Sequence, residues 1–181
     1  MKIAVIIIGL FISSSQIFAS GSQHDEHQHE NLDAHVHGHA KLLIVVEKNI
    51  VDILMEASAD TFIGFEHRPK TKKEIAAYKK FYTAWTKENN KIFIFPKKFG
   101  CRVKGANSSW KGKKSDKHKN LALAAKYMCQ PPIQKTEIKM VLEPYFDRVK
   151  EIEIDVLPLE DMPYTKEAKN NKKTKEITLK L

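Results

Sequence analysis

Histidine is concentrated in one short part of the sequence, because six of the eight histidines lie between residues 24 and 39. Three of them, His35, His37 and His39, alternate just before an apolar run. Successive side chains of an extended strand point to opposite faces, so these three imidazoles are expected to share one face. Neighbouring rings would lie about 7 Å apart, near enough for two to bind one ion, and a bend at Gly38 would bring in the third. The spacing therefore predicts a metal site at the start of a strand.

Further ligands are expected from other parts of the chain. The candidates are His67, the adjacent Glu66, and the upstream His24, His27 and His29. A ligand set dominated by imidazoles favours zinc first, and copper or nickel next. The plainer alternatives are that the upstream histidines form a solvated tail and that His67 fixes a turn through hydrogen bonds. His118 is not expected to bind metal, because the lysines around it would repel a cation.

The first twenty residues have the pattern of a secretory signal peptide. Lys2 precedes an apolar run over residues 3–12, and small residues follow near Ala19. This pattern is too short for a stable membrane span, and no later stretch is apolar enough to cross a bilayer. We therefore expect a signal peptide at 1–20, a histidine-rich flexible arm at 21–34 and a single exported domain at 35–181, with no stable membrane anchor.

The chain is basic, with 31 lysines and arginines against 22 acidic residues. Such an excess is typical of a solvated surface, and it also allows weak attraction to anionic polymers or lipid head groups of the cell envelope. Nucleic acid is not expected as a partner, because the chain carries an export signal and no nucleic-acid-binding motif.

Cys101 and Cys129 are the only cysteines. Paired cysteines in an exported protein are typically oxidised, so we expect a structural disulfide between them. The chain has no CxxC spacing, which argues against a redox role or a cysteine-based zinc site.

The pattern of apolar residues predicts an α+β domain with one main amphipathic helix on a mostly antiparallel sheet. Residues 41–57 contain two apolar runs around a short polar turn, which predicts a β-hairpin of largely buried strands. Thr71 and Glu74 form a capping box, so a helix with its aromatic residues in the core is expected over about 72–88. Further strands are expected at 91–95, 101–105, 121–129, 138–143, 150–158 and 177–181. Residues 106–120 are expected to form a lysine-rich surface loop.

Two classes of function compete with metal binding. A zinc ion with three histidines and a water molecule could activate hydroxide, as in a hydratase or hydrolase. The chain has no motif such as GxSxG or HExxH, so an enzyme is not expected. The second alternative is a module that docks onto an envelope protein or an anionic polymer and uses its histidines as a pH sensor.

The most distinctive segments are AHVHGHAKL at residues 34–42 and GFEHRP at residues 64–69. Together with the second half of the chain, they resemble the ZrgA family of periplasmic zinc-uptake proteins of Gram-negative bacteria. The resemblance implies a zinc-binding periplasmic protein with histidine ligands that assists import, with a zinc importer or its binding protein as partner. The chain departs from the family at 106–120, which is lysine-rich where members often carry a histidine- and aspartate-rich insertion.

Overall fold

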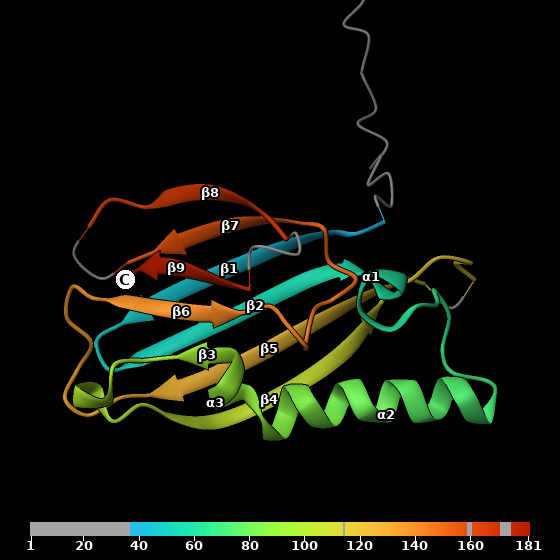
Figure 1. Cartoon of the computed structure of the whole chain (residues 1–181), viewed down its shortest axis with the longest axis horizontal. Helices are drawn as coiled ribbons and strands as arrows, with labels where there is room; N and C mark the ends of the chain where they lie inside the picture. The colour runs from blue at the N-terminus through green and yellow to red at the C-terminus, as the bar shows by residue number, and fades with distance from the viewer. Residues whose placement is uncertain (1–36, 114, 159–160, 171–174) are drawn as a thin grey trace, which may run out of the picture. The chain divides into compact units, whose positions relative to one another are not determined.

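Two β-sheets and three α-helices form the part of the chain that the computed structural model describes, which is residues 37–113, 115–158, 161–170 and 175–181 (Figure 1). The strands are β1 (His39–Glu47), β2 (Ile50–Ser58), β3 (Phe93–Ile94), β4 (Arg102–Lys111), β5 (Asn120–Met128), β6 (Glu137–Val141), β7 (Glu151–Leu157), β8 (Tyr164–Lys169) and β9 (Glu176–Lys180). The helices are α1 (Ala59–Ile63), α2 (Lys72–Lys87) and α3 (Asn89–Ile92), and a 3-10 turn, η1, spans Lys97–Phe99. The expected signal peptide and the histidine-rich arm lie outside the described residues.

The larger sheet has the strand order β4-β5-β2-β1-β7-β8, and the smaller sheet has the order β3-β6-β9. Among the described strands, β1 and β7 pair in parallel and every other pair is antiparallel. The expected α+β class with a mostly antiparallel sheet is therefore confirmed. None of the helices in the described part has the length and apolar character needed to cross a bilayer.

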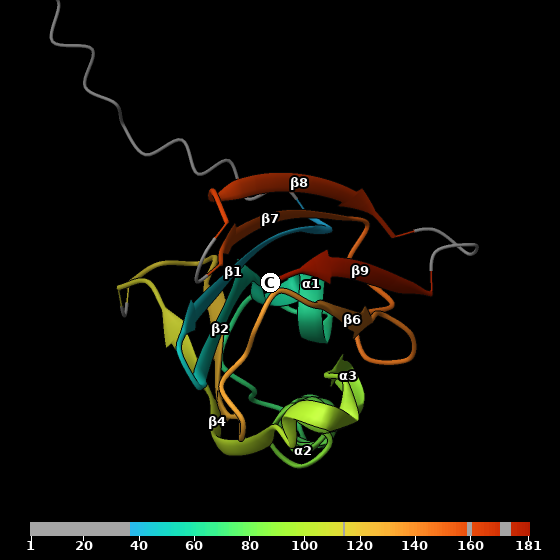
Figure 2. The ribbon, with the colours of Figure 1, turned by 90° about the vertical axis from the view of Figure 1, so that its left-hand side faces the viewer.

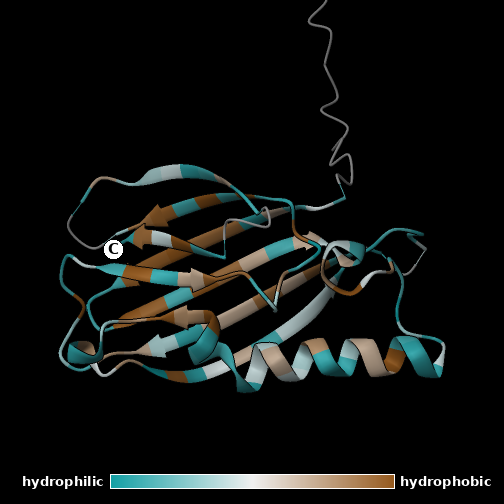
Figure 3. Cartoon of the chain, in the orientation of Figure 1, coloured by the Kyte–Doolittle hydropathy of each residue, from teal (hydrophilic) through white to brown (hydrophobic). Residues whose placement is uncertain are grey.

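The hairpin expected at 41–57 is confirmed as β1 and β2, which are joined by a turn at Lys48 and Asn49. Along β1, buried side chains such as Leu42 and Ile44 alternate with partly exposed ones. The expectation that these strands are largely buried is therefore wrong for one face. The smaller sheet lies on the concave side of the larger one (Figure 2). Hydrophobic residues are frequent along the central strands of the larger sheet (Figure 3).

Helix α2 begins at the expected capping box. The Thr71 side chain accepts a hydrogen bond from the Glu74 backbone N–H, and the Glu74 carboxylate accepts one from the Thr71 backbone N–H. The aromatic residues are less buried than expected, because only Trp85 is fully enclosed. Its indole N–H donates to the carbonyl oxygen of Asn107 in β4 at 2.9 Å, which fixes the helix against the edge of the sheet.

Three strand predictions need correction. The strand expected at 91–95 is reduced to the two residues of β3, because α3 takes residues 89–92. The loop expected at 106–120 is strand β4 as far as residue 111. Strand β8 at 164–169 was not expected at all. Both β4 and β8 lie at an edge of the larger sheet. An edge strand can form through backbone hydrogen bonds to its one neighbour, so its sequence need not alternate between apolar and polar residues.

The interior between the sheets is apolar. Ile44, Ile53, Leu123 and Ile154 from the larger sheet are completely buried. The expected disulfide is confirmed, because Cys101 and Cys129 are bonded beside the pair that joins the start of β4 to the end of β5. The disulfide links β4 and β5 at one end of the larger sheet. At the other end of the sheet, the first residues of β1 and β5 lie near α1.

Candidate functional site

The chain enters the larger sheet through a turn at His37 and Gly38. Gly38 has a φ of 86°, which favours glycine, and its N–H donates to Thr61 Oγ1 at 2.9 Å. Its carbonyl oxygen accepts hydrogen bonds from the backbone N–H groups of Lys150 and Glu151, at 2.7 and 3.0 Å. The chain does bend at Gly38, but the bend precedes β1, so His37 lies in a turn and His39 in the strand. The expectation of one extended strand with the imidazoles of both residues on one face is therefore wrong. His37 is therefore part of a turn that is anchored on both sides.

The His37 imidazole lies between two carboxylates. Its Nδ1 is 3.0 Å from Asp60 Oδ2, and its Nε2 is 3.5 Å from Glu66 Oε1. Asp60 belongs to α1, and Glu66 belongs to the loop that follows this helix. The imidazole is thus held by one carboxylate on each ring nitrogen.

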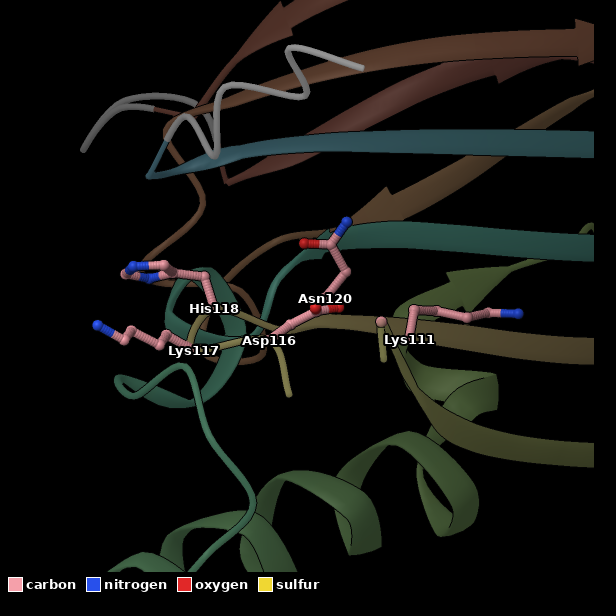
Figure 4. A pocket seen from close by; sticks show the side chains of 6 residues that line it. Lys111, Asp116, Lys117, His118 and Asn120 are labelled. Atoms are coloured by element: carbon pink, nitrogen blue, oxygen red, sulfur yellow. The ribbon is translucent and has the colours of Figure 1, made fainter. Parts of the chain in front are cut away.

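The second oxygen of Glu66 contacts a second imidazole. Glu66 Oε2 pairs with Nδ1 of His118, from the loop between β4 and β5. Figure 4 shows the His118 side chain extending away from Asn120 at the start of β5. The backbone fixes this approach, because the Lys119 N–H donates to the Glu66 carbonyl oxygen at 3.0 Å. Glu66 therefore links the two histidines.

Burial differs sharply within this group of side chains. The Glu66 side chain is 16% exposed, whereas the His37 and His118 side chains are each 58% exposed. Glu66 Oε1 is fully enclosed and accepts no hydrogen bond within the described residues. A buried carboxylate oxygen without a hydrogen-bond donor is costly, so a cationic partner at this position would be favourable.

Asp60 is itself fixed by Arg148, from the segment before β7. Arg148 Nε donates to the Asp60 carbonyl oxygen at 3.1 Å, and Nη2 lies 3.5 Å from Asp60 Oδ1. The guanidinium offsets the charge of Asp60 on the side away from His37. The other carboxylate oxygen of Asp60, Oδ2, contacts the His37 imidazole.

The other histidines expected from the sequence have different positions. His39 is the first residue of β1 and pairs with Glu151 of β7 in the parallel register. His67 Nδ1 lies 2.9 Å from the Arg68 carbonyl oxygen, and its Nε2 lies 3.7 Å from Glu74 Oε1. His24, His27, His29 and His35 lie outside the described residues. Of the expected ligands, the structure therefore brings His37 and Glu66 together.

Asp60 and His118 were missed as site residues by the sequence analysis. His118 was set aside because lysines flank it in the sequence, although its side chain reaches Glu66. The sequence contains no local signal for this contact, since 52 residues separate the two. In the described part of the chain, no three His, Cys, Asp or Glu side chains are already arranged to hold a metal ion. The site consists of imidazole–carboxylate pairs that share Glu66.

Residues 34–175, which are more than half of the chain, match the model of a known protein family, described as ZrgA family zinc uptake protein. No curated protein matches the chain significantly. The match begins just before His37 and includes all of the residues that form the imidazole–carboxylate pairs described above. A role related to zinc uptake and a disulfide both fit a protein of the cell envelope. The chain belongs to the ZrgA family of zinc uptake proteins.

Proposed function

We propose that this chain is a periplasmic zinc-binding accessory protein that captures Zn²⁺ through histidines and assists its uptake. The observation that carries the proposal is the placement of His37 and His118 on the two oxygens of the largely buried Glu66. Imidazole and carboxylate groups are common zinc ligands, and the family match supports zinc as the ion. The proposed role includes no catalytic step.

The histidines upstream of the sheet complete the proposal. His24, His27, His29 and His35 would capture the ion and deliver it to the folded domain. His39 and His67, two further ligands expected from the sequence, both follow His37. His67 contacts Glu74 and the Arg68 carbonyl oxygen, so the proposed site does not include it. The recipient of the ion would be a zinc importer or its binding protein.

Calorimetric titration with zinc tests ligation by histidine. Only neutral imidazole binds a metal, so affinity is expected to fall between about pH 7.5 and about pH 5.5, on either side of the usual histidine pKa. Protein purified without a histidine tag is required, because a tag would itself bind the ion. Equal affinity at the two pH values would reject histidine as the ligand.

A growth experiment tests the role in uptake. A strain that lacks this protein is expected to grow poorly when a chelator limits zinc, and the wild-type gene should restore growth. A gene in which His35, His37 and His39 are replaced by alanine is expected not to restore growth fully. Full restoration of growth by this variant would contradict zinc capture through these histidines.

The lysines of α2 favour a second candidate, which is docking onto an anionic envelope partner with histidines as a pH sensor. The exposed lysines of this helix are Lys72, Lys73, Lys79, Lys80 and Lys87. The His35, His37 and His39 alanine variant separates the two functions. Loss of zinc stoichiometry supports zinc capture, while retained zinc binding with altered, salt-sensitive binding to anionic polymer supports docking.

A further inference from the structure

Asp60 can select one tautomer of His37. The imidazole Nδ1 is 3.0 Å from Asp60 Oδ2, and a carboxylate can only accept a hydrogen bond. His37 must therefore carry a proton on Nδ1. In the neutral ring the lone pair is then on Nε2, which faces Glu66. A carboxylate that fixes the tautomer of a histidine in this way is the usual outer partner of a metal-bound imidazole.

A cation between His37 Nε2 and Glu66 Oε1 would be favourable when the imidazole is neutral. With the tautomer fixed by Asp60, both atoms are hydrogen-bond acceptors, and they are 3.5 Å apart. Two ligand atoms on one tetrahedral zinc ion, each bonded at about 2.0 to 2.1 Å, lie about 3.3 Å apart. The observed separation is close to this value. Either a second proton on the imidazole or a metal ion can resolve the contact. A metal ion there could also be bound by His118, whose Nδ1 pairs with the other oxygen of Glu66.

We infer that the folded part of the zinc site consists of His37 Nε2, the Glu66 carboxylate and His118 Nδ1, with Asp60 as the positioning residue for His37. This inference rests on the proposed zinc-binding function and assigns its ligands. Bound zinc would replace the direct imidazole–carboxylate contacts. The two exposed imidazoles would have to rotate to reach the ion, because no three such side chains of the described residues are already arranged to hold it. Three protein ligands leave one position of a tetrahedral ion open for a further donor.

The charges around the site agree with this assignment. Glu66 and Asp60 contribute two negative charges, and Arg148 offsets the one on Asp60. The remaining charge on Glu66 faces the position of the ion. Lys119 contributes its backbone N–H to the Glu66 loop, while its ammonium group donates to the Lys113 carbonyl oxygen. This lysine therefore directs its charge to another part of the loop.

Zinc titration of single variants of the full exported domain tests the ligand set. H118A and E66Q are each expected to weaken zinc binding by more than the roughly 10- to 100-fold loss that follows removal of an outer partner of a metal ligand. H67A is the matched control, because His67 is adjacent to Glu66 but contacts Glu74 and the Arg68 carbonyl oxygen. Its zinc affinity is expected to equal that of the wild type. Circular dichroism and thermal unfolding without metal show whether each variant is folded.

The role of Asp60 is tested by D60N and by nitrogen-15 NMR of the imidazoles. In the wild type, the His37 spectrum is expected to show a proton on Nδ1 without zinc and a metal-bound Nε2 with zinc. D60N should lose this tautomer preference and bind zinc about 10-fold more weakly. A purely structural role of Asp60 would lower stability without changing the tautomer of His37.

The outcomes separate this inference from the proposed function. If the wild type binds no zinc, the proposed function fails. If the wild type binds zinc, and folded H118A and E66Q bind it as tightly as H67A does, the ligand set is wrong although the function survives. Loss of binding in H118A and E66Q, with H67A unchanged, supports both.

Discussion

At the scale of single residues, the conformation of Gly38 decides where His37 lies. Gly38 has a left-handed backbone conformation, and β1 begins at the next residue. Hydrogen bonds to Thr61 on one side and to residues 150 and 151 on the other fix this turn. The imidazole is therefore held against Asp60 and Glu66 by local backbone geometry.

Replacement of Gly38 by alanine is expected to lower the free energy of unfolding by about 1 to 2 kcal/mol, because an L-residue is strained in this region. An added Cβ would also lie 2.9 Å from Lys150 Cδ. G105A is the matched control, since a Cβ at Gly105 meets no heavy atom within 4 Å. Urea unfolding of the two variants measures the difference. Equal stability of G38A and the wild type would show that the strain argument is wrong.

At the scale of secondary-structure elements, α2 combines one buried side chain with a capping box at its first turn. Trp85 is the one fully buried side chain of this helix, and Ile75 and Tyr82 are exposed. The reciprocal hydrogen bonds of Thr71 and Glu74 therefore provide much of the specificity for where the helix begins. Replacement of Thr71 by alanine is expected to cost about 1 kcal/mol, as measured by urea unfolding at neutral pH.

The capping box also predicts a pH dependence. Hydrogen bonds from the backbone N–H groups of Thr71 and Lys70 lower the pKa of Glu74 below its usual value of 4.5. This contribution is complete above the unfolded-state value and is lost as the pH falls through the lower folded-state pKa. The stability advantage of the wild type over E74Q should therefore be larger at about pH 6 than at about pH 3. E137Q, a change at an exposed glutamate of β6, is the control, and an advantage that is equally large in acid would contradict the prediction.

The Cys101–Cys129 disulfide links the elements β4 and β5 at one end of the larger sheet. The bonded residues are 28 positions apart in sequence. Replacement of both cysteines by serine should lower the free energy of unfolding by about 3.5 kcal/mol on the chain-entropy model. Urea unfolding of this variant, compared with the wild type in oxidised and reduced form, gives the measurement. A loss below about 1 kcal/mol would show that the link contributes little.

At the scale of the whole molecule, the proposed zinc site joins segments that are distant in sequence. His37 precedes β1, Asp60 and Glu66 lie in and after α1, and His118 precedes β5. A metal ion bound to all of these segments requires the folded sheet, so metal binding and folding are coupled.

Zinc is therefore expected to stabilise the fold. At a free concentration of about 100 times the dissociation constant, the gain in unfolding free energy is about 2.7 kcal/mol. Urea unfolding with zinc and with a chelator measures this gain. H118A should show a much smaller gain than H67A, and equal gains in the two variants would contradict a site that includes His118.

Features that depend on neighbouring residues could be predicted from the amino-acid sequence. These are the capping box and helix at α2, the β1–β2 hairpin and the pairing of the only two cysteines. The reason is that a hydrogen-bonded turn, a capping box or an alternating strand involves residues only a few positions apart. The α+β class follows from the same local patterns, and the expected histidine-rich arm stays a prediction.

How these elements pack against one another could be seen only in the folded protein. The edge strands β4 and β8 form through backbone hydrogen bonds to β5 and β7, which the side-chain pattern does not reveal. His37 contacts Asp60 and Glu66 because Gly38 turns the chain, whereas His39 begins the adjoining strand. The contact between His118 and Glu66 spans 52 residues and depends on the strand order of the sheet. Such a contact follows from the packing of whole elements, so no spacing within the sequence predicts it.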